Sequence, residues 1–170
     1  MIEPKTKTYM RRRFETKFGV LTQTLRKTIY MARTLTLFAG QWADMKLEDL
    51  APLAKKMGYE GLEIPLTQNH IDFDKCDDEA YLKSRWDILE KNGLNCFAIS
   101  NHLVGQCVCD EIDFRHKAML SPSIWGDGDP EGVRQRAASA MIKTAKIAKK
   151  FFALRPKSLG ESPIVPTVTG

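Results

Sequence analysis

Apolar residues along the chain gather in three short runs, separated by longer segments of mixed polarity. The runs are RTLTLFAG, YEGLEIPL and LNCFAIS, at residues 33–40, 59–66 and 94–100. They are rich in β-branched and large apolar side chains and lie next to Gly or polar residues, a pattern typical of buried β-strands. We therefore predict three strands.

The segments after these runs have apolar positions at helical spacing. The predicted helices cover residues 47–57, 79–92 with Asp77 or Asp78 as cap, and 130–150 with Asp129 as cap. Gly58 and Gly93 stand where the first two helices should end, because glycine readily takes the left-handed conformation that closes a helix. Strand and helix alternate three times, which predicts a parallel sheet with right-handed connections.

The end of the third unit breaks this pattern. The first two helices end in Lys-Met-Gly and Lys-Asn-Gly, whereas the third has Phe152 near the corresponding position. No clean strand follows, and three prolines interrupt the tail. We expect residues 152–170 to be an atypical tail that supplies at most a short edge strand at about Ile164–Val168.

Basic residues are concentrated in the first 30 positions. This stretch has eight Lys or Arg against two Glu, a net charge of +6, which leaves 18 bases and 19 acids for the remaining 140 residues. The folded part is therefore not built to bind phosphate backbones, and we expect no nucleic-acid partner. We treat residues 1–30 as a basic extension outside the domain. The alternative, an organelle presequence, is disfavoured because serine is missing and the helical amphipathicity is poor.

The remaining composition points to a cytoplasmic protein. No apolar run of about 18 residues is present, so we expect no membrane partner, and the basic start lacks the apolar core of a signal peptide. Four cysteines without framework spacing favour reduced thiols. Cys107 and Cys109 with His102 suggest zinc, but no second cysteine pair completes such a site. His116 is expected on the surface.

The third strand runs directly into Asn101 and His102. A strand that delivers an imidazole at its carboxyl end is how α/β barrels and open α/β sheets build active sites. His102 could polarise a substrate oxygen or bind a metal through one nitrogen. Otherwise it caps the strand or bonds to a loop backbone.

Four stretches resemble the xylose isomerase-like TIM barrels, the family of sugar phosphate isomerases and epimerases that includes an endonuclease IV branch. They are RTLTLFAGQWAD, LEDLAPLAKKMGYEGLEI, CFAISNHLVGQCVCD and WGDGDPEGVRQRA, in family order within residues 31–151. The resemblance implies a (β/α)₈ barrel with a divalent metal at the carboxyl ends of its strands. It also implies proton transfer between neighbouring carbons of a ketose or aldose.

The resemblance covers only part of that fold. A complete barrel needs roughly 250 residues, whereas the matching part holds about three βα units, so we expect an α/β protein with a partial TIM barrel over residues 31–151. The family's metal-binding carboxylates come mainly from later strands. We therefore assign no metal ligand here, although full-length members bind Mn, Mg, Co or Zn. Met31 resembles a natural start, and the tail resembles a truncation or a change of reading frame.

The resemblance and the strand positions together select five site residues. Glu63 and His102 are the catalytic candidates: Glu63 would bond sugar hydroxyls or assist proton transfer, or else form a structural ion pair. Trp42, His70 and Asn101 are the substrate-binding candidates. Trp42 would stack on a sugar or cover core, His70 would line the pocket or lie exposed in a loop, and Asn101 would orient a hydroxyl or turn the loop.

The expected function is metal-assisted proton transfer next to the carbonyl of a sugar or sugar phosphate, in a chain that is truncated and inactive alone. The alternative is a non-catalytic half-barrel that forms a homodimer, or a split-barrel subunit, through exposed sheet edges. A DNA-repair role like that of endonuclease IV is disfavoured by the balanced charge of the barrel part.

Overall fold

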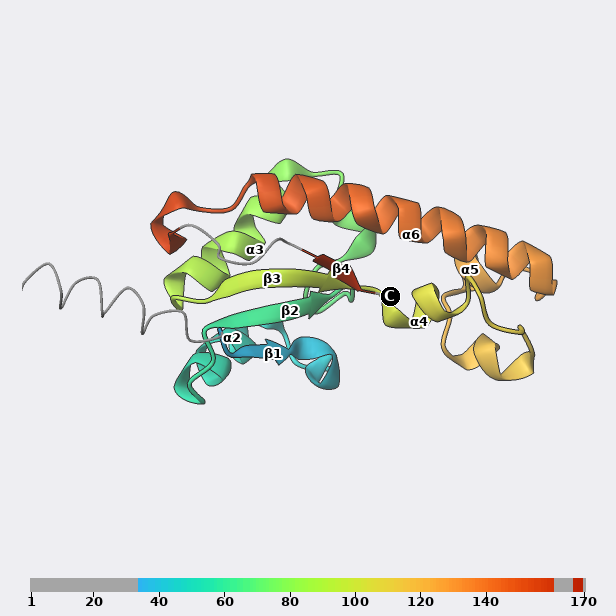
Figure 1. Ribbon diagram of the computed structural model, residues 1–170, viewed down its shortest axis with the longest axis horizontal. Helices are drawn as coiled ribbons and strands as arrows, with labels where there is room; N and C mark the ends of the chain where they lie inside the picture. Colours follow the sequence, from blue (N-terminus) through green and yellow to red (C-terminus); the bar gives the residue numbers. More distant parts are fainter. Residues whose placement is uncertain (1–33, 161–166, 170) are drawn as a thin grey trace, which may run out of the picture. The chain divides into compact units, whose positions relative to one another are not determined.

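The computed structural model describes residues 34–160 and 167–169. The described residues from Leu35 onward belong to one compact unit. The predicted basic extension at 1–30 lies outside the described residues. A sheet of four parallel strands occupies the centre of the unit (Figure 1). In sheet order the strands are β1 (Thr36–Phe38), β2 (Gly61–Pro65), β3 (Asn95–Ser100) and β4 (Thr167–Thr169).

Helices connect the strands in the predicted alternation. The longer helices are α2 (Leu47–Lys56), α3 (Glu79–Lys91) and α6 (Pro130–Ala153), and the shorter ones are α4 (His102–Gln106) and α5 (Pro122–Trp125). Short 3₁₀ turns are η1 (Ala39–Trp42), η2 (Phe73–Lys75), η3 (Phe114–Ala118) and η4 (Lys157–Leu159). None of the helices within residues 34–160 is long and apolar enough to cross a membrane.

The predicted helix boundaries have clear local causes. The Asp78 side chain accepts a hydrogen bond from the Ala80 amide at 2.8 Å, which caps α3. Asp129 caps α6 in the same way, through the Gly132 amide at 2.7 Å. Gly93 follows α3 with a φ of 61°, a conformation that side chains with a Cβ rarely adopt. The predictions of these caps and ends are confirmed.

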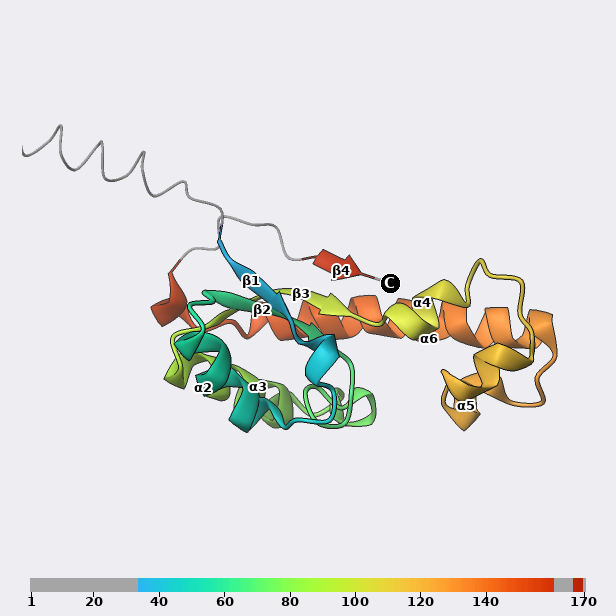
Figure 2. The ribbon, with the colours of Figure 1, turned by 90° about the horizontal axis from the view of Figure 1, so that it is seen from below.

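The order of the strands places the longer helices on one face. Each strand lies next to the strand that precedes it in the chain, so right-handed connections never reverse direction and bring every connecting helix to the same side. Accordingly, α2, α3 and α6 lie on the same side of the sheet (Figure 2), and all three contribute to a single hydrophobic core. No described helix covers the opposite face. The predicted α/β class with a parallel sheet is confirmed.

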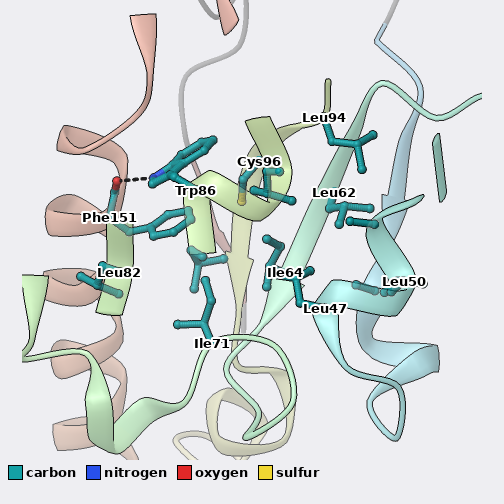
Figure 3. Packing of buried hydrophobic residues seen from close by; sticks show 14 of the residues in the cluster. Leu47, Leu50, Leu62, Ile64, Ile71, Leu82, Trp86, Leu94, Cys96 and Phe151 are labelled. Carbon is teal, nitrogen blue, oxygen red and sulfur yellow. Dashed lines mark hydrogen bonds between the residues drawn. The ribbon is translucent and has the colours of Figure 1, made fainter. Parts of the chain in front are cut away.

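The core between sheet and helices is closed by an aromatic pair (Figure 3). Trp86 of α3 stacks on Phe151 of α6, with 4.6 Å between ring centroids and 13° between ring planes. The Trp86 indole also donates a hydrogen bond to the Phe151 carbonyl oxygen at 2.8 Å. Because Phe151 is fully buried, α6 continues to Ala153, beyond the predicted end at Lys150.

The tail contributes a fourth strand to the sheet. The predicted edge strand at about Ile164–Val168 corresponds to β4, which pairs with β3 at Ala98, Ile99 and Ser100. Val168 packs against the core. The strand is only three residues long, and Ile164 lies outside the described residues.

A long excursion between β3 and α6 builds a second, smaller core. It packs Cys107, Ile112 and Leu120 against the N-terminal half of α6, which runs past the carboxyl ends of the strands (Figure 1). His116 belongs to this excursion and is 7% exposed, so the prediction that it lies on the surface is wrong. Its ring takes part in the capping box of η3, where Nδ1 accepts the Asp113 amide hydrogen at 3.1 Å.

Candidate functional site

The candidate site lies at the carboxyl ends of the strands, on the face without a described helix. Leu62 and Ile64 belong to the core on the helix-covered face. Side chains alternate along a strand, so Glu63 between them points to the other face. The same alternation places Thr169 there, because its neighbour Val168 packs against the core.

His102 reaches Glu63 from the first position of α4. Its Nε2 lies 3.2 Å from Glu63 Oε1, and the two side chains are 44% and 23% exposed. The Thr169 hydroxyl donates to the same carboxylate oxygen at 2.9 Å. Phe38, at the end of β1, meets the imidazole edge to face with 5.3 Å between ring centroids. Residues from four parallel strands or their ends thus hold one carboxylate and one imidazole.

The geometry assigns a tautomer to His102. A carboxylate can only accept hydrogen bonds, so we place the proton on Nε2 and leave Nδ1 as the free lone pair. An imidazole held by a carboxylate in this way keeps a fixed orientation and a fixed tautomer. The accessible Nδ1 could therefore accept a hydrogen bond or a proton from a bound hydroxyl compound.

Two hydroxyl groups at the ends of β2 and β3 have no hydrogen-bond partner in the described part of the chain. They belong to Ser100, the last residue of β3, and Thr67, just after β2, and both are buried. Buried hydroxyls normally bond to protein, water or ligand. The strand ends therefore have hydrogen-bonding capacity beyond what the protein uses.

Asn101 anchors the loop between β3 and α4. Its amide nitrogen Nδ2 donates to the Thr144 hydroxyl of α6 at 3.0 Å, and its backbone N–H donates to the Thr169 carbonyl at 2.9 Å. These bonds agree with the predicted loop-turning role. The remaining side-chain oxygen, Oδ1, is still an acceptor at the strand ends.

His70 and Trp42 lie in two loops that contact each other, and neither belongs to the Glu63–His102 pair. Asn69 joins the two loops, because its side chain donates to the Ala43 carbonyl at 2.8 Å. His70 is 0% exposed, so the alternative of a solvent-exposed loop histidine is wrong. Burial lowers the pKa of His70, and the nearby backbone groups of Met45 and Trp42 oppose this shift only in part.

Trp42 ends η1 as a half-buried side chain that packs against the main core. This placement matches its predicted alternative, a cover over the core. Neither Trp42 nor His70 has a described contact with Glu63 or His102. The structure thus brings the two catalytic candidates together, whereas these two binding candidates lie in neighbouring loops without a described contact to them.

The cysteines do not form a metal site with His102. Burial raises the pKa of Cys76 to about 11 and also raises the pKa of Cys96 and Cys107, so these thiols stay protonated near neutral pH. Cys107 donates its S–H to the Leu103 carbonyl at 3.2 Å. Within residues 34–160 and 167–169, no three His, Cys, Asp or Glu side chains are grouped so that they could hold a metal ion.

Two participants at the pair were missed in the sequence. Thr169 lies in a tail expected to be atypical, although its β-branched TVT pattern is a strand signal that could have identified it. Phe38 was assigned only to a strand, and no local feature of the sequence marks it as a neighbour of His102. Comparison with known proteins finds no matching family model and no significantly similar curated protein, so the site rests on geometry.

Proposed function

We propose that this chain forms part of a sugar isomerase or epimerase barrel of the xylose isomerase-like type, and that Glu63 and His102 form one wall of its sugar pocket. The observation that carries the proposal is the pairing of a carboxylate in the middle of β2 with an imidazole just after the carboxyl end of β3. Barrel enzymes bind substrate at that end. The sequential strand order with all longer helices on one face is also what a barrel segment requires.

In this proposal each side chain has a separate task. Thr169 and His102 both donate to Glu63 Oε1, which holds the carboxylate in place. Glu63 orients the imidazole, and His102 Nδ1 accepts a proton from a sugar hydroxyl or from the carbon next to the carbonyl. Phe38 packs against the ring and limits its rotation.

A divalent metal, where the family uses one, would polarise the sugar carbonyl. The described residues do not fit such an ion, because the pair supplies one carboxylate and one imidazole and no third ligand is grouped with them. We therefore derive no step through a metal and place any metal-binding wall outside the described residues.

Ligand-observed NMR on the full chain tests the proposal. We expect saturation transfer to D-fructose and D-fructose 6-phosphate, and loss of most of that signal in His102→Ala. Ser123→Ala, a hydroxyl removed from the β3–α6 excursion, is the control and should keep the signal. Equal transfer in wild type and His102→Ala would contradict the proposal.

A second candidate is the half-barrel that acts by assembly and not by catalysis. It is favoured by the apolar side chains exposed near β1, where Leu35 is 55% and Phe38 is 37% exposed. Light scattering after size exclusion would measure the mass of the particle. A dimer that Phe38→Ser converts to monomer would support assembly, whereas a monomer with sugar binding would leave the catalytic wall as the better account.

A further inference from the structure

A hollow lies at the carboxyl ends of β2 and β3, beside the Glu63–His102 pair but without a contribution from either side chain. Its volume is about 290 Å³, close to the lower end of the range for small-molecule sites, roughly 300–1,000 Å³. Leu66 follows β2 directly and Asn101 follows β3, and both line it. Open α/β sheets bind ligands outside the carboxyl ends of adjacent strands. Ala140 of α6 forms part of the wall.

We propose that this cavity binds a small uncharged aromatic molecule that carries one hydroxyl group. Its lining combines apolar side chains, Phe73 and Met119 among them, with several polar ones. Aromatic rings and thioether sulfurs both pack favourably against a ligand ring. Lys143 Nζ lies 4.4 Å from the Phe73 ring centroid and covers one face of that ring, which leaves its edge or other face for a ligand.

The polar groups that line the cavity favour a ligand with one hydroxyl group. Asn101 uses its Nδ2 on Thr144, so its Oδ1 remains to accept a hydrogen bond from a ligand hydroxyl. Ser121 and Ser123 lie with their hydroxyl oxygens 2.9 Å apart. One hydroxyl hydrogen serves that pair, and the other can be donated to the ligand oxygen.

Charge on the wall excludes ionised ligands. The Asp74 carboxylate lines the cavity and repels anions, while Lys143 beside Phe73 disfavours a cation at the aromatic end. A neutral ligand meets neither repulsion.

The cavity adjoins α4, the helix that presents His102. Leu103 and Val104, the two residues after His102, line the cavity, while His102 itself contacts Glu63. Binding should therefore be visible at the amide signals of these two residues. The inference stands apart from the proposed proton transfer, since neither Glu63 nor His102 lines the cavity.

The test is a titration of the full chain with benzyl alcohol, followed by amide NMR spectra. We expect saturable shifts at Leu103 and Val104 with a dissociation constant on the order of 1 mM. Ala140→Leu fills the wall and should weaken binding at least tenfold. Ala145→Leu makes the same change on the exposed side of α6 and should leave binding unchanged.

A second variant keeps the test decisive if Ala140→Leu does not fold. Ser123→Ala should weaken benzyl alcohol and leave toluene, which has no hydroxyl, unaffected. Absence of saturable shifts in wild type would overturn the inference, as would unchanged binding in a folded Ala140→Leu variant. Benzoate binding as tightly as benzyl alcohol would overturn the proposed ligand class.

Discussion

The two faces of the sheet receive side chains from the same strands but have different contents. On the helix-covered face, Leu62 and Ile64 of β2 are fully buried with the aromatic pair of α3 and α6. On the other face, Glu63 between them bonds to His102 and Thr169 and stays partly exposed. Alternation along one strand thus separates packing from chemistry, and changes to the two faces should have separable effects.

The largest expected effect is on the helix-covered face. Trp86→Ala removes the stack on Phe151 and the hydrogen bond to its carbonyl. We expect the free energy of unfolding to fall by about 3–5 kcal/mol, because a fully buried aromatic leaves a cavity. Urea unfolding measures it. Thr169→Val, on the other face, is the control and should cost about 1 kcal/mol or less. Equal losses in both variants would remove the distinction between the faces.

The next effect tests how tightly the face without a described helix is packed near its amino-terminal end. A Cβ on Gly61 would lie 2.3 Å from Cε2 of the Phe97 ring, and Phe97 is only 6% exposed. Gly61→Ala should therefore lower the free energy of unfolding by about 1–3 kcal/mol through overpacking.

The cause of that loss can be checked with a double-mutant cycle. Phe97→Ala removes the ring that the new methyl group meets, so the cost of Gly61→Ala should be smaller in the Phe97→Ala background. Additive costs would show that the ring does not confine Gly61.

A smaller effect concerns His70 in the loop after β2 and should appear as a dependence of the free energy of unfolding on pH. Burial lowers the pKa of His70 below its ordinary value of 6.5. Below that value the unfolded chain binds more protons than the folded one, so the free energy of unfolding should fall as the pH drops from about 7 toward 5. Urea midpoints across this range measure the effect. His70→Gln should flatten the dependence, and an unchanged slope in that variant would assign it to other groups.

The smallest expected change in stability is at the pair itself. Glu63→Gln keeps a hydrogen-bond acceptor for Thr169 but removes the charge opposite His102. Since both side chains are partly exposed, we expect a change of about 1 kcal/mol or less in the free energy of unfolding. A loss as large as that of Trp86→Ala would show that Glu63 and His102 form a structural ion pair that stabilises the fold.

The sequence predicts the regular part of this fold well because local signals and burial agree there. The caps at Asp78 and Asp129 and the apolar runs determine elements that the tertiary structure only extends, as at Phe151. The excursion after β3 was not predicted in detail, since its short turns depend on packing against α6. His116 shows this: its basic neighbours indicate surface, whereas its ring is 7% exposed and takes part in the capping box of η3.

The candidate site could be predicted only in part. Glu63 and His102 follow from strand alternation and a strand end. Their contact, however, needs the register between β2 and β3, which includes an irregularity after Leu62. Thr169 joins them only because the tail adds β4 beside β3. Such long-range pairings leave no periodic trace in the sequence.

The most direct test of the central claim is the response of the His102 ring signals to a ketose. Ring carbon–proton NMR spectra of wild type and Glu63→Gln would be recorded during titration with D-fructose, with glycerol as the control polyol. We predict saturable shifts of the His102 signals in wild type, much weaker shifts in Glu63→Gln, and none with glycerol. Unmoved His102 signals in wild type at saturating ketose, or the same shifts in both proteins, would contradict the claim that this pair is a sugar-binding wall.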